Sequence, residues 1–155
     1  MTYRITGLDP AAFAHLADAN EEVLAAQNAV RVTAAKKPGY PCRITLEDAE
    51  PGETLILLNH VSHDVATPYR SSYAIYVREN AREAAEYIDA VPTVFAGRPL
   101  GLRAFDADGI LQTAMLALPG EADKKIRAVF ADPDIAYIHA HNAAHGCFAA
   151  KVERA

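Results

Sequence analysis

Three histidines, an asparagine and one of the two cysteines lie within residues 137–148, near the end of the chain. Imidazole and thiol groups serve proteins in proton transfer, nucleophilic attack and zinc binding. His141 and Cys147 are therefore the candidate catalytic residues, and Asn142 is a candidate substrate contact. An imidazole beside a thiol favours the nucleophilic thiolate. The alternative is a buried structural cysteine, because the apolar run 148–150 follows it.

The same residue types are zinc ligands, and a zinc site needs three or four of them. Here Cys42 would have to join His141 and Cys147. In a hairpin, His139 and His141 share one face because side chains alternate, and Cys147 joins them only if the connecting loop has an odd number of residues. Since the sequence does not decide this parity, zinc binding ranks third among the hypotheses, and no cofactor is assigned.

Two loops place an arginine beside a tyrosine, a combination suited to anion binding. The first loop, 36–43, contains Tyr40 and Arg43, and its two prolines should make it stiff. The second loop contains Tyr69 and Arg70 after a proline. A guanidinium group binds carboxylate or phosphate with two parallel hydrogen bonds. The simpler alternative, which also applies to Arg78, Arg98 and Arg103, is an arginine paired with one of the 20 acidic residues.

Composition and patterning argue against several functional classes. A net charge of −5 argues against binding to a nucleic-acid backbone, and no apolar run approaches the length of a membrane span. The first residues resemble a strand rather than a signal peptide, which predicts a cytoplasmic protein with free thiols. Motifs typical of nucleotide binding, calcium binding or common hydrolases do not occur.

The order of elements predicts one α+β domain over residues 1–155, with a mainly antiparallel sheet and a single layer of three to four helices packed on it. The dipeptide Asp108-Gly109 predicts a hairpin turn over 106–109, because both residues tolerate positive φ. The predicted strands are 3–5, 30–34, 54–59, 73–77, 100–105, 110–116, 135–141 and 147–152. The predicted helices are 11–19, 21–28, 79–90 and 119–131.

Several segments together resemble an uncharacterised bacterial family, the domain of unknown function 1203. They occur in the same order as in that family, and they are 38–43, 47–53, 55–59, 68–70, 74–78 and 141–147. Because no activity is attached to the family, the resemblance implies a stand-alone domain and carries over no catalytic residues. It coincides with the three segments selected above for their chemistry.

Two further hypotheses precede zinc binding. In the first, the two arginine loops and the C-terminal hairpin turn meet at one pocket that binds or acts on a small anionic molecule. Arg43 and Arg70 would hold the anion, with His141 and Cys147 beside the reacting group. In the second, the chain is a non-catalytic structural or interaction module, such as a homodimer. Whether the chain is an enzyme is left open.

Overall fold

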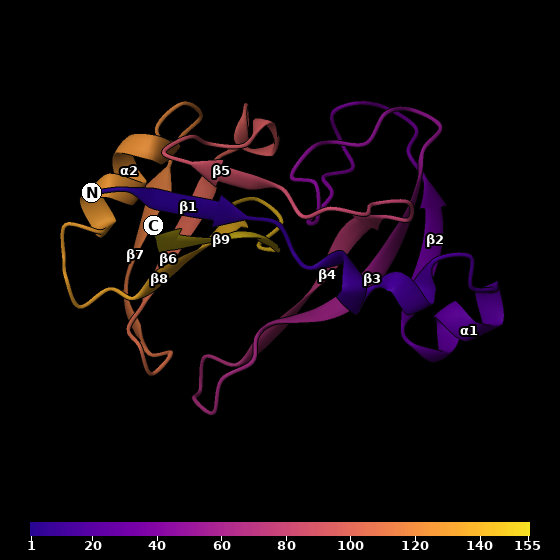
Figure 1. Cartoon of the computed structure of the whole chain (residues 1–155), viewed down its shortest axis with the longest axis horizontal. Helices are drawn as coiled ribbons and strands as arrows, with labels where there is room; N and C mark the ends of the chain where they lie inside the picture. The colour runs from indigo at the N-terminus through magenta and orange to yellow at the C-terminus, as the bar shows by residue number, and fades with distance from the viewer.

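The structure, a computed structural model, describes all 155 residues and contains two antiparallel sheets. The larger sheet has the strand order β5-β1-β9-β8-β6-β7, and the smaller sheet has the order β2-β3-β4. Both termini lie on the side of the larger sheet, and the smaller sheet forms the other half of the molecule (Figure 1).

The bounds of the elements are as follows. The larger sheet contains β1 (Tyr3–Thr6), β5 (Glu86–Ile88), β6 (Leu100–Phe105), β7 (Leu111–Ala117), β8 (Tyr137–Asn142) and β9 (Phe148–Arg154). The smaller sheet contains β2 (Ala29–Thr33), β3 (Thr54–His63) and β4 (Ser71–Arg78). The α-helices are α1 (Glu21–Ala26) and α2 (Ala122–Val129), and 3-10 helices cover Pro10–Ala12, Ala14–Leu16 and Thr93–Phe95. No helix combines the length and the apolar composition needed to cross a bilayer.

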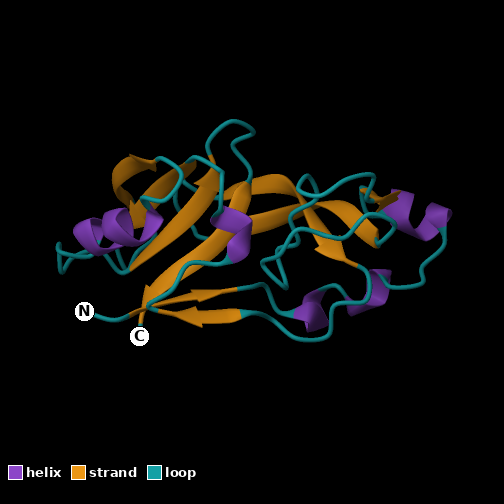
Figure 2. Cartoon of the chain, turned by 90° about the horizontal axis from the view of Figure 1, so that it is seen from above, coloured by secondary structure: helices purple, strands orange, loops and turns teal.

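The predicted α+β class with a layer of three to four helices was wrong, because the chain is mostly antiparallel sheet with two short α-helices. The helices are separate short pieces that do not form one layer over a sheet (Figure 2). The largest error is the helix predicted over 79–90, which is a connection followed by β5. This segment must pass from one sheet to the other, and extended backbone covers about twice the distance per residue that a helix does.

The helix predicted over 11–19 is also absent. Asp9 accepts a hydrogen bond from the backbone N–H of Ala11 (2.9 Å) and starts a short 3-10 helix instead. Asp18 then adopts a positive φ of 57°, which stops helical backbone before Asn20. The predicted second helix is present in shortened form as α1, because the Asn20 side chain accepts a hydrogen bond from the Val23 N–H (2.8 Å).

The hairpin predictions were closer to the structure. One carboxylate oxygen of Asp106 accepts hydrogen bonds from the backbone N–H groups of Asp108 (2.9 Å) and Ile110 (3.0 Å), and Gly109 has a φ of 81°. Strands β3 and β4 pair antiparallel as predicted, but they extend to His63 and from Ser71. Their longer hairpin therefore reaches beside the larger sheet (Figure 1).

The larger sheet has two faces of different character. One face packs its apolar side chains, such as Leu102, Ile138 and Val152, against Ile126 and Val129 of α2. Because side chains alternate along β8, the other face carries its tyrosine and two histidines. A separate apolar cluster, built around α1 and strands β3 and β4, forms the core of the smaller sheet.

The two halves are joined at Gly7, just after β1. Its backbone N–H donates to Ala85 O (2.9 Å), and a Cβ built on Gly7 would lie 1.9 Å from Ile44 O. Only glycine permits this approach of backbone to backbone. The connection between the two sheets therefore requires a glycine at position 7.

Gly7→Ala should lower the free energy of unfolding by about 3 kcal/mol, because the backbone around Ile44 must move to admit the methyl group. The matched control is Gly101→Ala in β6, where the added Cβ meets no atom within 4 Å. Urea denaturation followed by circular dichroism measures both. Equal effects of the two substitutions would contradict this account.

Candidate functional site

A cavity of about 570 Å³ lies where the loop between β2 and β3, strands β3 and β4, the segment before β6, and the turn between β8 and β9 meet. We call it the cysteine pocket. Its lining contains two arginines and one histidine but no aspartate or glutamate. The lining residues are Gly39, Pro41, Arg43, Leu57, Tyr73, Ala74, Tyr76, Gly97, Arg98, Pro99, Asn142, Ala143, Ala144, His145 and Cys147.

The turn between β8 and β9 separates Cys147 from the histidines. His141 pairs with Phe148 across the hairpin, and the Asn142 N–H donates to Cys147 O (2.9 Å). The turn between Asn142 and Cys147 is thus the four residues 143–146. Because this loop has an even number of residues, Cys147 is paired with Asn142 and lies on the opposite face of the hairpin from His141.

Arg43 is buried beside Cys147, with 2% of its surface exposed. Its Nε donates to Phe148 O (2.8 Å), one Nη donates to Pro41 O (2.6 Å), and the other donates to Cys147 Sγ (3.1 Å). No carboxylate forms an ion pair with it. Burial lowers the pKa of Arg43, and the neighbouring Cys147 opposes that shift. An arginine nevertheless keeps its charge, so the interior holds an uncompensated cation.

The half-buried thiol of Cys147 lies at the edge of the pocket between two donors. Besides Arg43, the Asn142 side-chain amide donates to Cys147 Sγ (3.5 Å). No hydrogen bond joins the thiol to an imidazole, since His141 uses its Nδ1 to donate to Gly146 O (2.9 Å). The structure therefore brings Cys147 together with a cation and an amide, without a general base.

Cys42 occupies a very different environment. It is fully buried, and its sulfur accepts hydrogen bonds from the backbone N–H groups of Ile44 (3.4 Å), Thr45 (3.4 Å) and Arg78 (3.2 Å). This sulfur closes a turn, as a serine or aspartate oxygen does elsewhere. No three His, Cys, Asp or Glu side chains are grouped to hold a metal ion, so the zinc hypothesis has no ligand set here.

The other arginines separate into paired and unpaired groups. Arg98 also lines the cysteine pocket, but it binds both oxygens of Asp48 (2.8 and 2.7 Å). Burial would raise the pKa of Asp48, yet Arg98 and the Gly39 N–H together hold it below its usual value. Arg70 pairs with exposed Asp64 (3.0 Å). Acids also neutralise Arg78, whereas Arg43 and Arg103 form no ion pair.

A second, adjacent cavity of about 330 Å³ lies between the tip of the β3–β4 hairpin and the polar face of the larger sheet. We call it the histidine pocket. Tyr73 lines both cavities. The residues lining the histidine pocket are Pro68, Tyr69, Arg70, Ser71, Tyr73, Arg103, Phe105, Leu111, Ala114, His139 and His141.

The predicted site residues are thus divided between two cavities. The cysteine pocket receives Arg43, Asn142 and Cys147, and the histidine pocket receives Tyr69, Arg70 and His141. The remaining predicted residue, Tyr40, packs on Tyr76 (ring centroids 5.3 Å apart) and lines neither cavity. Two of the three predicted segments therefore share the first cavity, and the loop with Tyr69 and Arg70 lines the second.

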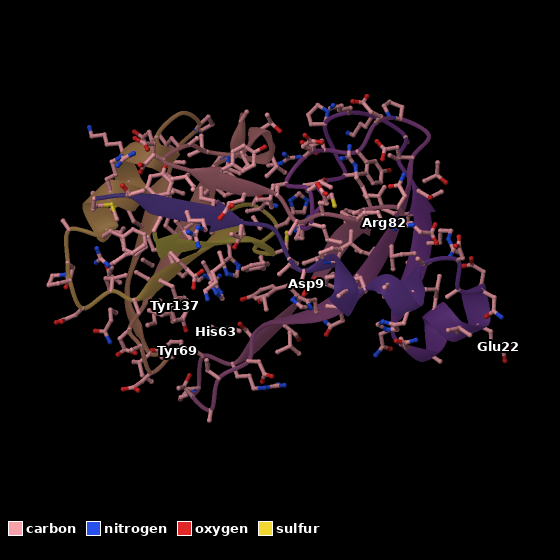
Figure 3. The ribbon with its side chains drawn as sticks, in the orientation of Figure 1. Asp9, Glu22, His63, Tyr69, Arg82 and Tyr137 are labelled. Carbon is pink, nitrogen blue, oxygen red and sulfur yellow. The ribbon has the colours of Figure 1, made fainter.

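Sequence reasoning did not select His63 as a site residue. Its Nδ1 donates to Tyr69 O (2.8 Å), which leaves Nε2 to accept from the Tyr137 hydroxyl (2.6 Å). The three residues lie together in Figure 3, where the hairpin tip meets β8. His139 was recognised only as a possible partner of His141. The alternation of Tyr137, His139 and His141 was the available signal for this polar face.

Burial also sets the charge states of His139 and His141. Desolvation is the largest influence in both cases, lowering the pKa of His139 to about 3 and that of His141 to about 4. Neighbouring cationic groups, including Arg103, act in the same direction, whereas the hydrogen bond to Gly146 O opposes the shift at His141. Both imidazoles are therefore neutral at physiological pH.

Fold and site together define an antiparallel two-sheet protein with polar cavities between its sheets. Compared with known families, the chain matches the one described as a protein of unknown function (DUF1203) over residues 39–154, and it belongs to that family. This confirms the resemblance seen in the sequence. No curated protein and no solved structure matches the chain.

The two thiols should differ in reactivity toward a neutral reagent such as 4,4′-dithiodipyridine. Half-buried Cys147 should react in the native protein, whereas Cys42 should react about a thousandfold more slowly, because it is reached only when the core opens. The fast phase should disappear in Cys147→Ser and persist in Cys42→Ser. Fast labelling of Cys42 in the native protein would contradict the structural role assigned to it.

The two neutral histidines should make stability depend on pH. Their folded-state pKa values lie below the ordinary 6.5, so as the pH falls below 6.5 the unfolded state gains protons first and stability is lost. Between pH 7 and 4.5 the loss should be about 2 kcal/mol for each histidine.

Urea denaturation across this range measures the effect. His139→Phe should remove the part due to His139 and leave the parts due to His141 and to His60, whose pKa burial also lowers. The same substitution at exposed His15 is the control and should leave the pH dependence unchanged. Staying above pH 4.5 limits the contribution of Asp48 and Asp123, whose pKa values are lowered and whose stabilisation is lost at more acid pH. A flat profile between pH 7 and 4.5 would refute the assignment.

Proposed function

We propose that this protein binds a small anionic molecule in the cysteine pocket. The observation that carries the proposal is Arg43, a cation buried to 98% with no carboxylate partner, which lines a cavity that contains no acid. A buried charge is costly unless it is paired, and an anion in the cavity would supply the missing charge.

The paired arginines support this reading of Arg43. Arg98 is neutralised by Asp48, and Arg78 by Glu47 and Glu53. Near the cysteine pocket, the other two arginines that hold loops are thus paired with acids, whereas exposed Arg154, far along the chain, binds only carbonyl groups. Arg43 departs from this pairing at the one place where a buried guanidinium borders the cavity.

The surrounding groups favour a carboxylate or a phosphate group as the anion. Asn142 could contribute amide hydrogen bonds at the mouth, while Tyr73 and Tyr76 provide a wall for the rest of the molecule. The volume of about 570 Å³ is within the range of small-molecule sites. Cys147 would lie next to the bound anion, because its sulfur already contacts the Arg43 guanidinium.

The proposal is limited to binding. The catalytic roles predicted for His141 and Cys147 would require a proton transfer between them, but His141 lies on the other side of the hairpin and faces Tyr73 and Phe148. Cys147 could still act as a nucleophile if the bound molecule supplied its own base. Binding without catalysis needs no such assumption.

Protection of Cys147 from the neutral thiol reagent is the direct test. Inorganic phosphate, acetate and larger carboxylates at millimolar concentration should include at least one that slows labelling and raises the melting temperature. Saturation at 100 times the dissociation constant should add about 2.7 kcal/mol to the free energy of unfolding. Arg43→Met should abolish both effects, whereas Arg70→Met, which removes an exposed arginine outside this pocket, should keep them.

Arg43 also holds structure, so a second variant leaves it in place. Ala144 is an exposed residue in the pocket lining, and Ala144→Phe should fill part of the cavity and prevent protection. If no anion protects Cys147 in the wild-type protein, the binding proposal fails. The alternative of a non-catalytic interaction module would then be the better account.

A further inference from the structure

The histidine pocket contains a second set of polar groups without partners, and this set does not depend on Arg43. Its lining includes two arginines and two histidines and no aspartate or glutamate. One of the arginines, Arg70, is neutralised by Asp64 at the surface. A cavity with cationic groups and no acid of its own attracts anions.

Arg103 is the free cation of this cavity. It extends from β6 and donates from one Nη to the Tyr73 hydroxyl (2.8 Å), with its guanidinium near the Tyr73 ring. It forms no ion pair, and its other N–H groups have no acceptor within the protein. These groups remain able to bind a carboxylate with two hydrogen bonds.

His139 lies directly across from Arg103 in the register of β6 and β8. Only 3% of its surface is exposed, yet neither ring nitrogen forms a hydrogen bond to the protein. His63 and His141, by contrast, both use ring nitrogens in hydrogen bonds. The ring nitrogens of His139 are not sealed in the interior but reach the cavity, where a carboxylate could accept a hydrogen bond from the imidazole N–H.

Aromatic side chains also line the cavity. Phe105 stacks on Tyr137 with ring centroids 5.4 Å apart, which fixes its orientation. Tyr69, 39% exposed, lies edge-on to Phe105 at 6.3 Å and projects toward the solvent. Rings arranged in this way pack well against another flat ring.

We propose that the histidine pocket binds a small aromatic carboxylate. Its carboxylate group accepts hydrogen bonds from Arg103 and His139, and its ring packs against Tyr69 and Phe105, which both line the cavity. This site is separate from the cysteine pocket, because the edge-on contact between Tyr73 and His141 (4.9 Å) lies between the two cavities.

Benzoate is the simplest probe, and the imidazole signals in nuclear magnetic resonance spectra of the intact protein report where it binds. We expect saturable shifts at His139 and His141. Exposed His15 should not move, and any shift at His145, which lines the cysteine pocket, should saturate with a separate dissociation constant. Acetate, which lacks the ring, should bind at least about 10-fold more weakly.

Two variants test the roles of the charge and of the cavity. Arg103→Met should weaken benzoate binding about 10-fold or more, whereas Lys124→Met, an equal change of charge at an exposed position on α2, should have no effect. Ala114→Trp, at an exposed position in the lining, should abolish the shifts by filling the cavity without removing a hydrogen bond.

Three results would overturn the proposal. Shifts confined to His145 would place benzoate in the cysteine pocket. If acetate bound as tightly as benzoate, the aromatic ring would contribute nothing to binding. The absence of saturable shifts in the wild-type protein would remove the site altogether, whatever the outcome for the cysteine pocket.

Discussion

The buried guanidinium of Arg43 is the interaction on which the arrangement of the two sheets depends. Its backbone N–H donates to Tyr76 O in β4 (3.0 Å), and its carbonyl accepts from the Leu8 N–H (2.8 Å) in the segment that follows β1. The side chain then reaches Phe148 O at the start of β9 (2.8 Å). One residue thus bonds to both sheets and to the turn that carries Cys147. Two carbonyl groups and the Cys147 sulfur accept its hydrogen bonds without neutralising its charge, and burial of that charge distinguishes it from the exposed Arg154, which also lacks an acid partner.

The boundary between the sheets is polar because the larger sheet already uses its other face to bury aliphatic side chains against α2. The β8 side chains that point away from α2, toward the boundary between the sheets, are those of Tyr137, His139 and His141. The two cavities lie at this boundary, and burial of the rings there lowers the pKa values of His139 and His141.

Local signals in the sequence were sufficient for most strands and for the hairpin over 106–109, because alternation and turn chemistry act over a few residues. They failed for 79–90, whose alanine-rich composition favours a helix but whose course is set by the distance between two sheets. The candidate site, too, could be predicted only where local patterns determine it. Alternation placed His139 and His141 on one face, whereas the meeting of Arg43 with Cys147 is a contact across 104 positions in the chain. The parity of the last turn also depends on the register of β8 and β9, which no single segment determines.

The position of both cavities gives a bound molecule a structural effect as well as a chemical one. The cysteine pocket is lined by β3 and β4 on one side and by the β8–β9 turn on the other, and the histidine pocket joins the hairpin tip to β6 and β8. A ligand in either cavity would therefore contact both sheets, and its binding free energy would add to the contacts that hold them together. Two cations without an acid partner, Arg43 and Arg103, lie one at each cavity, so an anion would stabilise the boundary where the cavity linings supply no negative charge. Binding of an anion at either cavity would in this way also complete the interface between the sheets.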